Sequence, residues 1–277
     1  MMSDWQDLLT RFPPEEIVTN GGKISRRQAG SGPDLVLLHG IGSASGSWVH
    51  QMSAFARHFR VTAWDAPGYG TSDCLATATP AAADYADALA IFLDVLSINR
   101  ATFIGHSLGA LMAGAFAAQH PDRIEALILA SPALGYGKAD TAVRDAKLNG
   151  RLEMMADLGP EGMARERAGN LLSSSASAEQ LAHVKWNMTQ LRVDGHAAAA
   201  YMLAHGDLAS DAALIDQPFE VMCGGGDTIT TAAASRDFAE VYAFATYTEI
   251  PVAGHAIYIE NPDAFNALVT RVLGVTA

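Results

Sequence analysis

The chain has 277 residues, of which 49% are hydrophobic, and carries a formal net charge of −12. It can bury one large core, but no apolar run is long enough to span a membrane and no cluster of Lys and Arg resembles a nucleic-acid footprint. We therefore expect a small-molecule substrate and neither a membrane nor a nucleic acid as partner; an anionic substrate would need a local cationic pocket.

The N-terminal residues and the cysteines indicate the compartment. Residues 1–7 are acidic and lack the basic-then-apolar order of a secretory signal, which predicts a cytoplasmic protein. Cys74 and Cys223 lie far apart in the sequence, so reduced thiols are favoured over a disulfide, and no zinc-binding spacing is present. We expect no metal site, and the sequence leaves open whether the protein forms homo-oligomers.

Strand and helix patterns alternate along the first half of the chain. In order, we expect an irregular lead-in (1–15), a β-hairpin with its turn at residues 20–22 (16–28), a buried strand (34–38), a helix with apolar residues at 48, 52, 55 and 59, a strand (60–65), a helix that begins at Pro80 with Thr79 as N-cap, a strand (101–106), a helix (108–119) and a strand (124–130). This alternation implies a mainly parallel sheet, whose chemistry lies at the carboxyl ends of its strands.

The alternation of strand and helix patterns stops after residue 132. Residues 133–211 contain helical patterns but no strand candidate, and we interpret them as an inserted helical cap. The core then resumes with a strand (218–223), a helix (232–242), a strand (246–250) and a closing helix (262–273). The predicted organisation is thus an α/β core in two parts, 1–132 and 212–277, that flank the cap.

Residues 105–109 read Gly-His-Ser-Leu-Gly at the junction of a buried strand and a helix. A serine in such a sharp turn has strained backbone angles, and neighbours with side chains would collide there, so both flanks must be glycine. The turn lifts the hydroxyl of Ser107 clear of the sheet and directs the amide of Leu108 toward an oxyanion. The alternative is that Ser107 is only a turn residue.

A serine hydroxyl needs a base to take its proton, and a carboxylate that fixes the tautomer of that base. His255 follows Gly254 after the last strand, and Asp227 follows three glycines after the preceding strand. The order Ser107, Asp227, His255 is the one this architecture predicts. For the second oxyanion donor we expect a backbone amide of the 39–42 loop, with Ile41 as first choice and Gly42 as second.

Other residues compete for these roles. We predict structural hydrogen bonds for His39 and His106, and helix-surface or cap positions for the remaining histidines, which are His50, His58, His120, His183, His196 and His205. Some proteins of this architecture place the acid after the strand that follows the serine helix, where Ser131 stands here. Asp65 ends a strand too, but is expected to hold its loop by hydrogen bonds.

Taken together, these motifs resemble the α/β-hydrolase superfamily. The resemblance rests on residues 39–42, 65–72, 105–109, 226–227, 254–255 and 260–262, and covers nearly the whole chain outside the cap. It implies an α/β fold with an eight-stranded, mostly parallel sheet flanked by helices, a helical lid, and no metal or organic cofactor. Haloalkane dehalogenases and epoxide hydrolases of this superfamily would place Asp where Ser107 stands.

Within the superfamily, residues 194–208 are similar to the lids of 3-oxoadipate enol-lactonases and related esterases. We therefore predict a serine hydrolase that cleaves a small carboxylic ester or lactone through an acyl-enzyme, such as an enol-lactone from aromatic-compound degradation. One alternative is a hydrolase of C–C bonds in vinylogous diketones, although these relatives usually carry Asn where His106 stands and a more glycine-rich loop around Ile41. Another is a ligand-sensing protein with slow turnover.

The predicted cap is nearly neutral, whereas the rest of the chain is acidic. The net charge is −2 in residues 133–211 and −10 in the remaining residues. Its cations are therefore candidates for binding a substrate carboxylate, while the alternative for each is a solvated helix face. The candidate substrate-binding residues are Arg144, Lys147, Arg151, Arg192 and Trp186.

Overall fold

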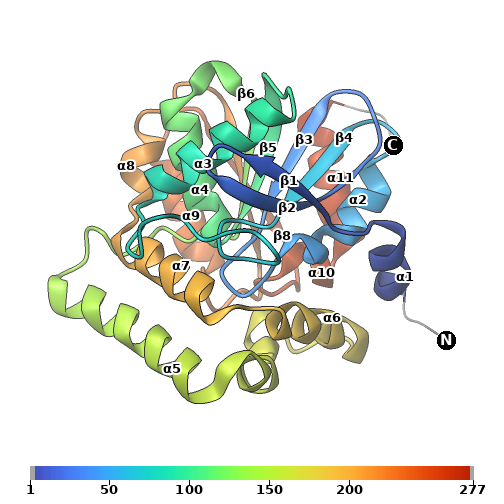
Figure 1. Cartoon of the computed structure of the whole chain (residues 1–277). Coiled ribbons are helices and arrows are strands. Elements are labelled where there is room, and N and C mark those ends of the chain that lie inside the picture. The colour runs from blue at the N-terminus through green and yellow to red at the C-terminus, as the bar shows by residue number, and fades with distance from the viewer. Residues whose placement is uncertain (1–3, 275–277) are drawn as a thin grey trace.

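An eight-stranded sheet forms the centre of the computed structural model, which describes residues 4–274 (Figure 1). Its order is β1-β2-β4-β3-β5-β6-β7-β8. Only β2 is antiparallel to its neighbours. The strands are β1 (Glu15–Thr19), β2 (Gly22–Ala29), β3 (Asp34–Leu38), β4 (Arg60–Trp64), β5 (Ala101–His106), β6 (Ile124–Ala130), β7 (Phe219–Gly224) and β8 (Ala245–Ile250). The predicted α/β class and mostly parallel sheet are confirmed.

Helices cover both faces of this sheet (Figure 1). On one face α3 packs against α4, and on the other α2 packs against α11. The helices are α1 (Asp4–Arg11), α2 (Val49–Phe55), α3 (Ala82–Val95), α4 (Leu108–Gln119), α5 (Thr141–Arg167), α6 (Ala178–Thr189), α7 (Val193–His205), α8 (Leu208–Ala212), α9 (Ala232–Glu240), α10 (Ile257–Glu260) and α11 (Pro262–Leu273), with short 3₁₀ helices η1 (Ser45–Trp48), η2 (Pro121–Arg123) and η3 (Ala168–Leu171).

The centre of the core lies where β5 leads into α4. Every residue of β5 is buried, and α4 is buried on all sides from Leu108 to Ala117 because small residues let it lie close to the sheet and to α8. At Gly114 an added Cβ would come within 2.4 Å of the Leu208 side chain on α8. This close packing fixes the start of α4, and therefore the position of Ser107.

All elements between β6 and β7 in the structure are helical. Helix α5 contacts α6 and α7, and the three lie together beside the sheet (Figure 1). Gly159 interrupts α5 with φ 61° and ψ 178°, immediately before Pro160. A proline inside a helix has no N–H for the backbone hydrogen bond to the preceding turn. Helix α5 therefore consists of two segments that meet at Gly159. These helices occupy the segment predicted as a cap, and its separate domain status stays a prediction.

Two predicted boundaries are wrong. The irregular lead-in expected over residues 1–15 is wrong for 4–11, where α1 forms and buries Trp5 against the body of the molecule, and residues 1–3 lie outside the described part of the chain. Helix α3 begins at Ala82, two residues after Pro80, and its N-cap is Ala81 instead of Thr79. The reason is that the Asp84 carboxylate accepts the Ala81 N–H at 2.7 Å, which satisfies an amide at the helix start.

Two further sequence features are reflected in the fold. Cys74 and Cys223 are both free, as predicted. Among the helices of residues 4–274, none combines the length and the apolar character that a membrane span requires.

Candidate active site

Ser107 lies at the turn between β5 and α4 in a strained backbone conformation, with φ 53° and ψ −112°. Two hydrogen bonds with the end of β6 and the residues after it hold this conformation. Ser107 N–H donates to Ala130 O at 2.9 Å, and Ala133 N–H donates to Ser107 O at 3.1 Å. A Cβ added at Gly105 would lie 2.4 Å from Gly109 O. Only glycine fits on either side of this serine, and the serine side chain is directed into a cavity.

Asp227 and His255 form a buried pair beside this turn. His255 Nδ1 lies 2.8 Å from Asp227 Oδ2, and the other carboxylate oxygen accepts the amides of Ile229 at 2.8 Å and Thr230 at 3.0 Å. Burial alone would raise the pKa of Asp227, but the hydrogen bond and charge of His255, together with these amides, bring the pKa well below its usual value. An ionised Asp227 keeps the proton of His255 on Nδ1 and leaves Nε2 as a base.

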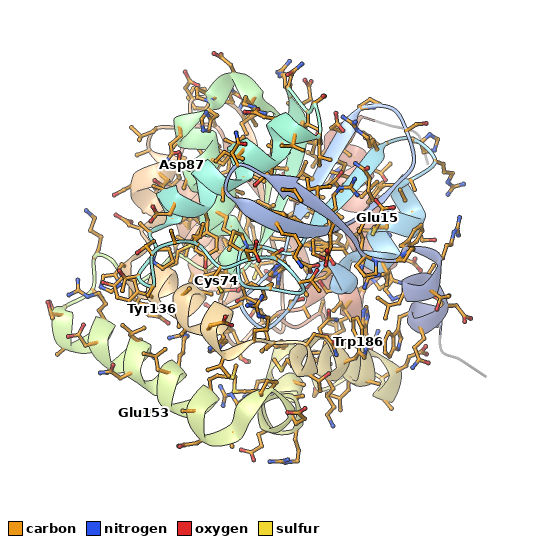
Figure 2. All side chains as sticks on the ribbon, viewed as in Figure 1. Glu15, Cys74, Asp87, Tyr136, Glu153 and Trp186 are labelled. Atoms are coloured by element: carbon orange, nitrogen blue, oxygen red, sulfur yellow. The ribbon has the colours of Figure 1, made fainter. Side chains whose placement is uncertain are left out.

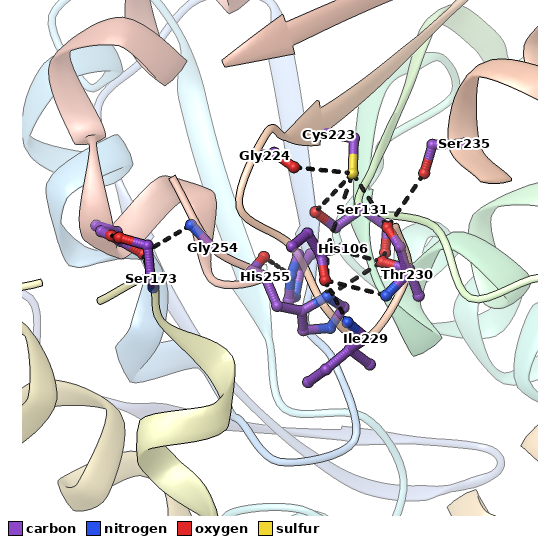
Figure 3. Close-up of polar contacts among 12 residues, drawn as sticks. His106, Ser131, Ser173, Cys223, Gly224, Ile229, Thr230, Ser235, Gly254 and His255 are labelled. Carbon is purple, nitrogen blue, oxygen red and sulfur yellow. Dashed lines mark hydrogen bonds and ion pairs between the residues drawn. The ribbon is translucent and has the colours of Figure 1, made fainter. Parts of the chain in front are cut away.

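Thr230 contacts both members of this pair and was not predicted from the sequence. Its hydroxyl lies 2.9 Å from Asp227 Oδ2, 3.1 Å from His255 Nδ1 and 3.0 Å from Ser131 O (Figure 3). Its place three residues after Asp227, where its amide can bond back to the carboxylate, is the signal that could have found it. The threonine therefore fixes both partners of the pair.

His39 and His106 belong to the framework, as predicted. The buried His39 ring donates from Nδ1 to Gly40 O at 2.9 Å and accepts the Ala66 amide on Nε2 at 3.1 Å. His106 donates from Nε2 to the His255 backbone carbonyl at 2.9 Å. Burial, together with the nearby charge of His255, lowers the pKa of His106 to about 3, so this ring is neutral and positions the segment that carries His255.

Asp65 has a structural role, as predicted, but its carboxylate holds segments other than its own loop. Its carboxylate accepts the Ser45 amide at 2.7 Å and the Ser25 hydroxyl at 2.6 Å. The first bond ties the segment after β3 to the end of β4, and the second ties β2 to the same carboxylate. The segment that follows the loop of Ile41 is therefore anchored to Asp65.

A cavity of about 560 Å³ contains Ser107 and His255 in its wall. The 39–42 loop contributes Ile41 and Gly42, and the Tyr69 hydroxyl holds Ile41 O at 3.0 Å. Within the described residues, the amides of Ile41 and Leu108 have no hydrogen-bond acceptor. The remaining wall is mostly apolar and comes largely from the helices between β6 and β7. Its large apolar residues are Leu134, Met154, Met163, Leu171, Met188 and Leu203.

The structure brings only part of the predicted substrate-binding set to this cavity. Arg151 and Lys147 line it. Arg144 lies beside Thr141 and Asp145 instead, and Arg192 donates to Ser72 O at 2.6 Å and pairs with Asp194 at 2.9 Å. Trp186 packs against Trp5, with its ring close to Gly46, on the side of α6 that faces α1 (Figure 2).

Two histidines predicted on helix surfaces or at caps are buried, and that prediction is wrong for both. His183 is 1% exposed, stacks on Trp5 and donates to Gly46 O at 3.1 Å. His196 is 3% exposed and lines the cavity. The spacing of His196 to Ala199, Ala200 and Leu203 places it on the buried face of α7, and this signal could have found it. Tyr136 and Arg167 also line the cavity and were not predicted.

Comparisons with known proteins agree with this geometry. A family model described as alpha/beta hydrolase fold matches residues 33–262. A Caulobacter sp. (strain K31) protein named as a candidate carbamate hydrolase is 28% identical over 266 residues, 92% of this chain and 93% of its own. The 3-oxoadipate enol-lactonase 2 of Acinetobacter baylyi is 28% identical over 251 residues, 87% and 88% of the two chains. The crystal structure of the enol-lactonase from Burkholderia xenovorans LB400 superposes with a TM-score of 0.81 at 28% identity, over 94% of this chain and 100% of that one.

Proposed function

The chain is a hydrolase of the alpha/beta hydrolase fold family, and from this premise we propose that it cleaves a small carboxylic ester or lactone with Ser107 as nucleophile. The observation that carries the proposal is the strained Ser107 in one cavity with His255, whose Nδ1 is bonded to the ionised Asp227. This arrangement supplies a nucleophile, a base and a group that orients the base.

In the first half of the reaction, Ser107 Oγ attacks the carbonyl carbon of the substrate. Nε2 of His255 takes the hydroxyl proton, and Asp227 stabilises the resulting imidazolium through the 2.8 Å bond to Nδ1. The C–O bond to the leaving alcohol or enol then breaks, and His255 returns the proton to that oxygen. For a lactone both products remain one molecule, attached to Ser107 as an acyl ester.

The oxyanion formed on attack needs donors that are already in place. The Leu108 amide at the start of α4 and the Ile41 amide of the 39–42 loop have no acceptor among the described residues, which supports them as these donors, with Gly42 as the alternative to Ile41. Each such donor is worth about 3 kcal/mol in the transition state. Water then attacks the acyl group, again with His255 as base, and releases the acid and free Ser107.

The size and lining of the cavity support a small acyl substrate. A volume of about 560 Å³ lies in the ordinary range for small-molecule sites, and the wall combines apolar side chains with a few polar groups. We propose that residues 133–211 act as the lid of this cavity. An enol-lactone of the kind formed in aromatic-compound degradation is a fitting member of the class, supported by the 28% identity to two enol-lactonases.

The first experiment compares the hydrolysis of 4-nitrophenyl acetate by the wild-type protein and by Ser107→Ala. We expect the variant to lose at least about a thousandfold in kcat, because it removes the proposed nucleophile and leaves only the oxyanion donors and the binding contacts. Circular dichroism and thermal unfolding establish that both proteins are folded.

A fluorophosphonate probe with mass spectrometry makes the test independent of the ester chosen. Wild-type protein should gain one adduct, located on the peptide that contains Ser107, and Ser107→Ala should gain none. A folded wild-type protein that neither turns over simple esters and lactones nor reacts with the probe would refute the proposed function.

A further inference from the structure

The cavity wall carries positive charge in a strongly acidic protein. Lys147, Arg151 and Arg167 line it, and none of the residues that the structure places in its wall is Asp or Glu. The chain as a whole has 30 acidic against 18 basic residues. The sign of the charge in the cavity is therefore opposite to that of the molecule, which favours an anionic ligand there.

Two of these cations act at one place. Lys147 and Arg151 are one helical turn apart on α5, with Lys147 Nζ 5.9 Å and Arg151 Cζ 5.5 Å from the centre of the Tyr136 ring. The ring holds both groups by cation–π contacts. Figure 2 shows Tyr136 between α5 and the body of the molecule, whereas Glu153 of the same helix points outward.

Neither cation is neutralised within the described part of the chain. No ion pair involves Lys147 or Arg151, and the guanidinium of Arg151 donates its one hydrogen bond to the backbone O of Lys147 at 2.9 Å. By contrast, Arg144 and Arg165 of the same helix both contact carboxylates. Lys147 and Arg151, which lie together at Tyr136 in the cavity wall, are thus available to a ligand, whereas Arg144 and Arg165 are already paired.

His196 adds an independent observation at the same place. It is 3% exposed, lies in the cavity wall, and its Nδ1 is buried without a hydrogen-bond partner in the described structure. No hydrogen bond within the described residues uses either ring nitrogen of His196, so the imidazole in the cavity wall is available to a ligand group. Burial, together with the charge of Arg151, lowers the pKa of His196 to about 4, so at neutral pH the ring is uncharged and can donate one N–H.

From this juxtaposition we propose that Lys147, Arg151 and His196 form a subsite for a carboxylate on the acyl group of the substrate. The inference rests on the proposed function and narrows it: the substrate is a half-ester or a lactone of a dicarboxylic acid. Its ester carbonyl lies at Ser107, which the sheet positions, and its free carboxylate lies against α5 and α7. The planar guanidinium of Arg151 matches a carboxylate in two parallel hydrogen bonds.

The test compares two substrates that differ by one methyl group. The 4-nitrophenyl half-ester of glutaric acid carries a free carboxylate, and in methyl 4-nitrophenyl glutarate this carboxylate is capped; both release 4-nitrophenolate. We expect wild-type protein to prefer the acid by at least about tenfold in kcat/KM, a typical effect of one charge-assisted contact. Arg151→Gln should lose most of this preference, because kcat/KM for the acid should fall through KM by a larger factor than kcat/KM for the capped ester.

Arg144→Gln is the matched control, because it removes a cation from the same helix outside the cavity. It should keep the preference of the wild-type protein for the acid. The double variant Lys147→Gln/Arg151→Gln should lose more of the preference than Arg151→Gln alone, and His196 and Arg167 account for any preference that remains. Glutarate itself should inhibit wild-type hydrolysis of 4-nitrophenyl acetate competitively, and Arg151→Gln should weaken this inhibition.

The outcomes separate the two proposals. If wild-type protein hydrolyses both esters with equal kcat/KM, or if Arg151→Gln and Arg144→Gln change the preference equally, the carboxylate subsite is refuted and the serine hydrolase stands. If neither ester reacts and the fluorophosphonate probe does not label Ser107, the proposed function itself fails.

Discussion

At the scale of single residues, the geometry around Ser107 depends on the absence of side chains at Gly105 and Gly109. Ser107 adopts φ 53°, a conformation that costs of order 1–3 kcal/mol for a non-glycine residue. The glycines beside the turn let neighbouring backbone approach it closely: a Cβ at Gly109 would lie 2.2 Å from Leu38 O and 2.9 Å from His39 O. These are backbone atoms of β3 and its loop, which cannot move without moving the 39–42 loop as well.

Replacement of Gly109 by alanine should therefore damage the fold itself. We expect Gly109→Ala to lower the free energy of unfolding by about 3 kcal/mol or more, measured by urea denaturation. Gly150→Ala is the control, since an added Cβ there meets nothing within 4 Å and the residue lies inside α5. That variant should be more stable than wild type by roughly 0.5–1 kcal/mol. Equal effects of the two substitutions would contradict the role given to the turn.

Thr230 allows a test of how the Asp227–His255 pair is positioned. Thr230→Val keeps the shape of the side chain and removes the hydroxyl that contacts Asp227 Oδ2 and His255 Nδ1. We expect kcat for 4-nitrophenyl acetate to fall about tenfold, equivalent to one hydrogen bond to a charged group, with KM nearly unchanged. Thr231→Val, which removes the hydroxyl that caps α9, should instead lower stability by about 1 kcal/mol and affect kcat less. A larger loss of kcat in Thr231→Val would contradict this assignment.

The candidate nucleophile, acid and base could be predicted from the sequence because each follows a strand at a glycine-marked turn. Their chemistry constrains spacing and order, and the carboxyl ends of parallel strands meet at one edge of the sheet. The cavity wall could not be predicted in the same way. Arg144 and Arg151 lie two helical turns apart on nearly the same face of α5, and only the packing of α5 against the rest of the molecule decides which of the two lines the cavity.

At the scale of elements, one carboxylate links residues 133–211, the proposed lid, to the loop that carries His255. Glu260, the last residue of α10, accepts the amides of Ser173 at 2.9 Å and Gly254 at 2.8 Å, and also the Ser173 hydroxyl (Figure 3). Ser173 follows η3 in the cap, and Gly254 directly precedes His255. The Ala256 amide donates to Leu171 O at 2.8 Å, which adds a second link. The position of the proposed lid is thus coupled to the position of His255, the proposed base.

Glu260→Gln should weaken this link while the side chain keeps its size. We expect a roughly threefold to tenfold lower kcat, since an amide group has only one acceptor oxygen for the three donors and carries no charge. Limited proteolysis should show faster cleavage within residues 172–176. Glu249→Gln on β8, which breaks a surface pair with Arg236, is the control and should change neither property. Unchanged kcat and proteolysis in Glu260→Gln would show that cap and base are independent.

The elements themselves were predictable to different degrees. Strands β3 and β5 are buried on both faces, and such strands read as continuous apolar runs bounded by glycine. Helix α1 was missed because it is short and mostly polar, with a mean composition that resembles a loop, although Trp5, Leu8 and Leu9 lie on one face. The start of α3 was misplaced because the capping group is the Asp84 side chain acting on Ala81, a residue type that gives no signal as an N-cap.

At the scale of the whole molecule, buried neutral histidines couple folding to pH. Burial is the main cause that lowers the pKa of His106 to about 3 and the pKa values of His183 and His196 to about 4. The unfolded chain, with ordinary histidine pKa values near 6.5, binds more protons than the folded chain between these limits. The contribution of these histidines to the free energy of unfolding is therefore fully present above pH 6.5 and is lost as the pH falls toward 4. Asp211, whose pKa burial and Asp207 raise to about 6, acts in the opposite sense.

His183 is the histidine best suited to test this coupling, because it lies outside the cavity between Trp5 and Gly46. A pKa that drops from its usual value to about 4 corresponds to about 2 kcal/mol of unfolding free energy lost between pH 7 and pH 5. His183→Gln retains an N–H donor for Gly46 O but cannot titrate, so urea denaturation should show a smaller loss over this pH range by about that amount. His58→Gln, at an exposed position, should retain the full wild-type loss. If His183→Gln and wild type lose the same stability between the two pH values, the acid sensitivity of the fold arises elsewhere.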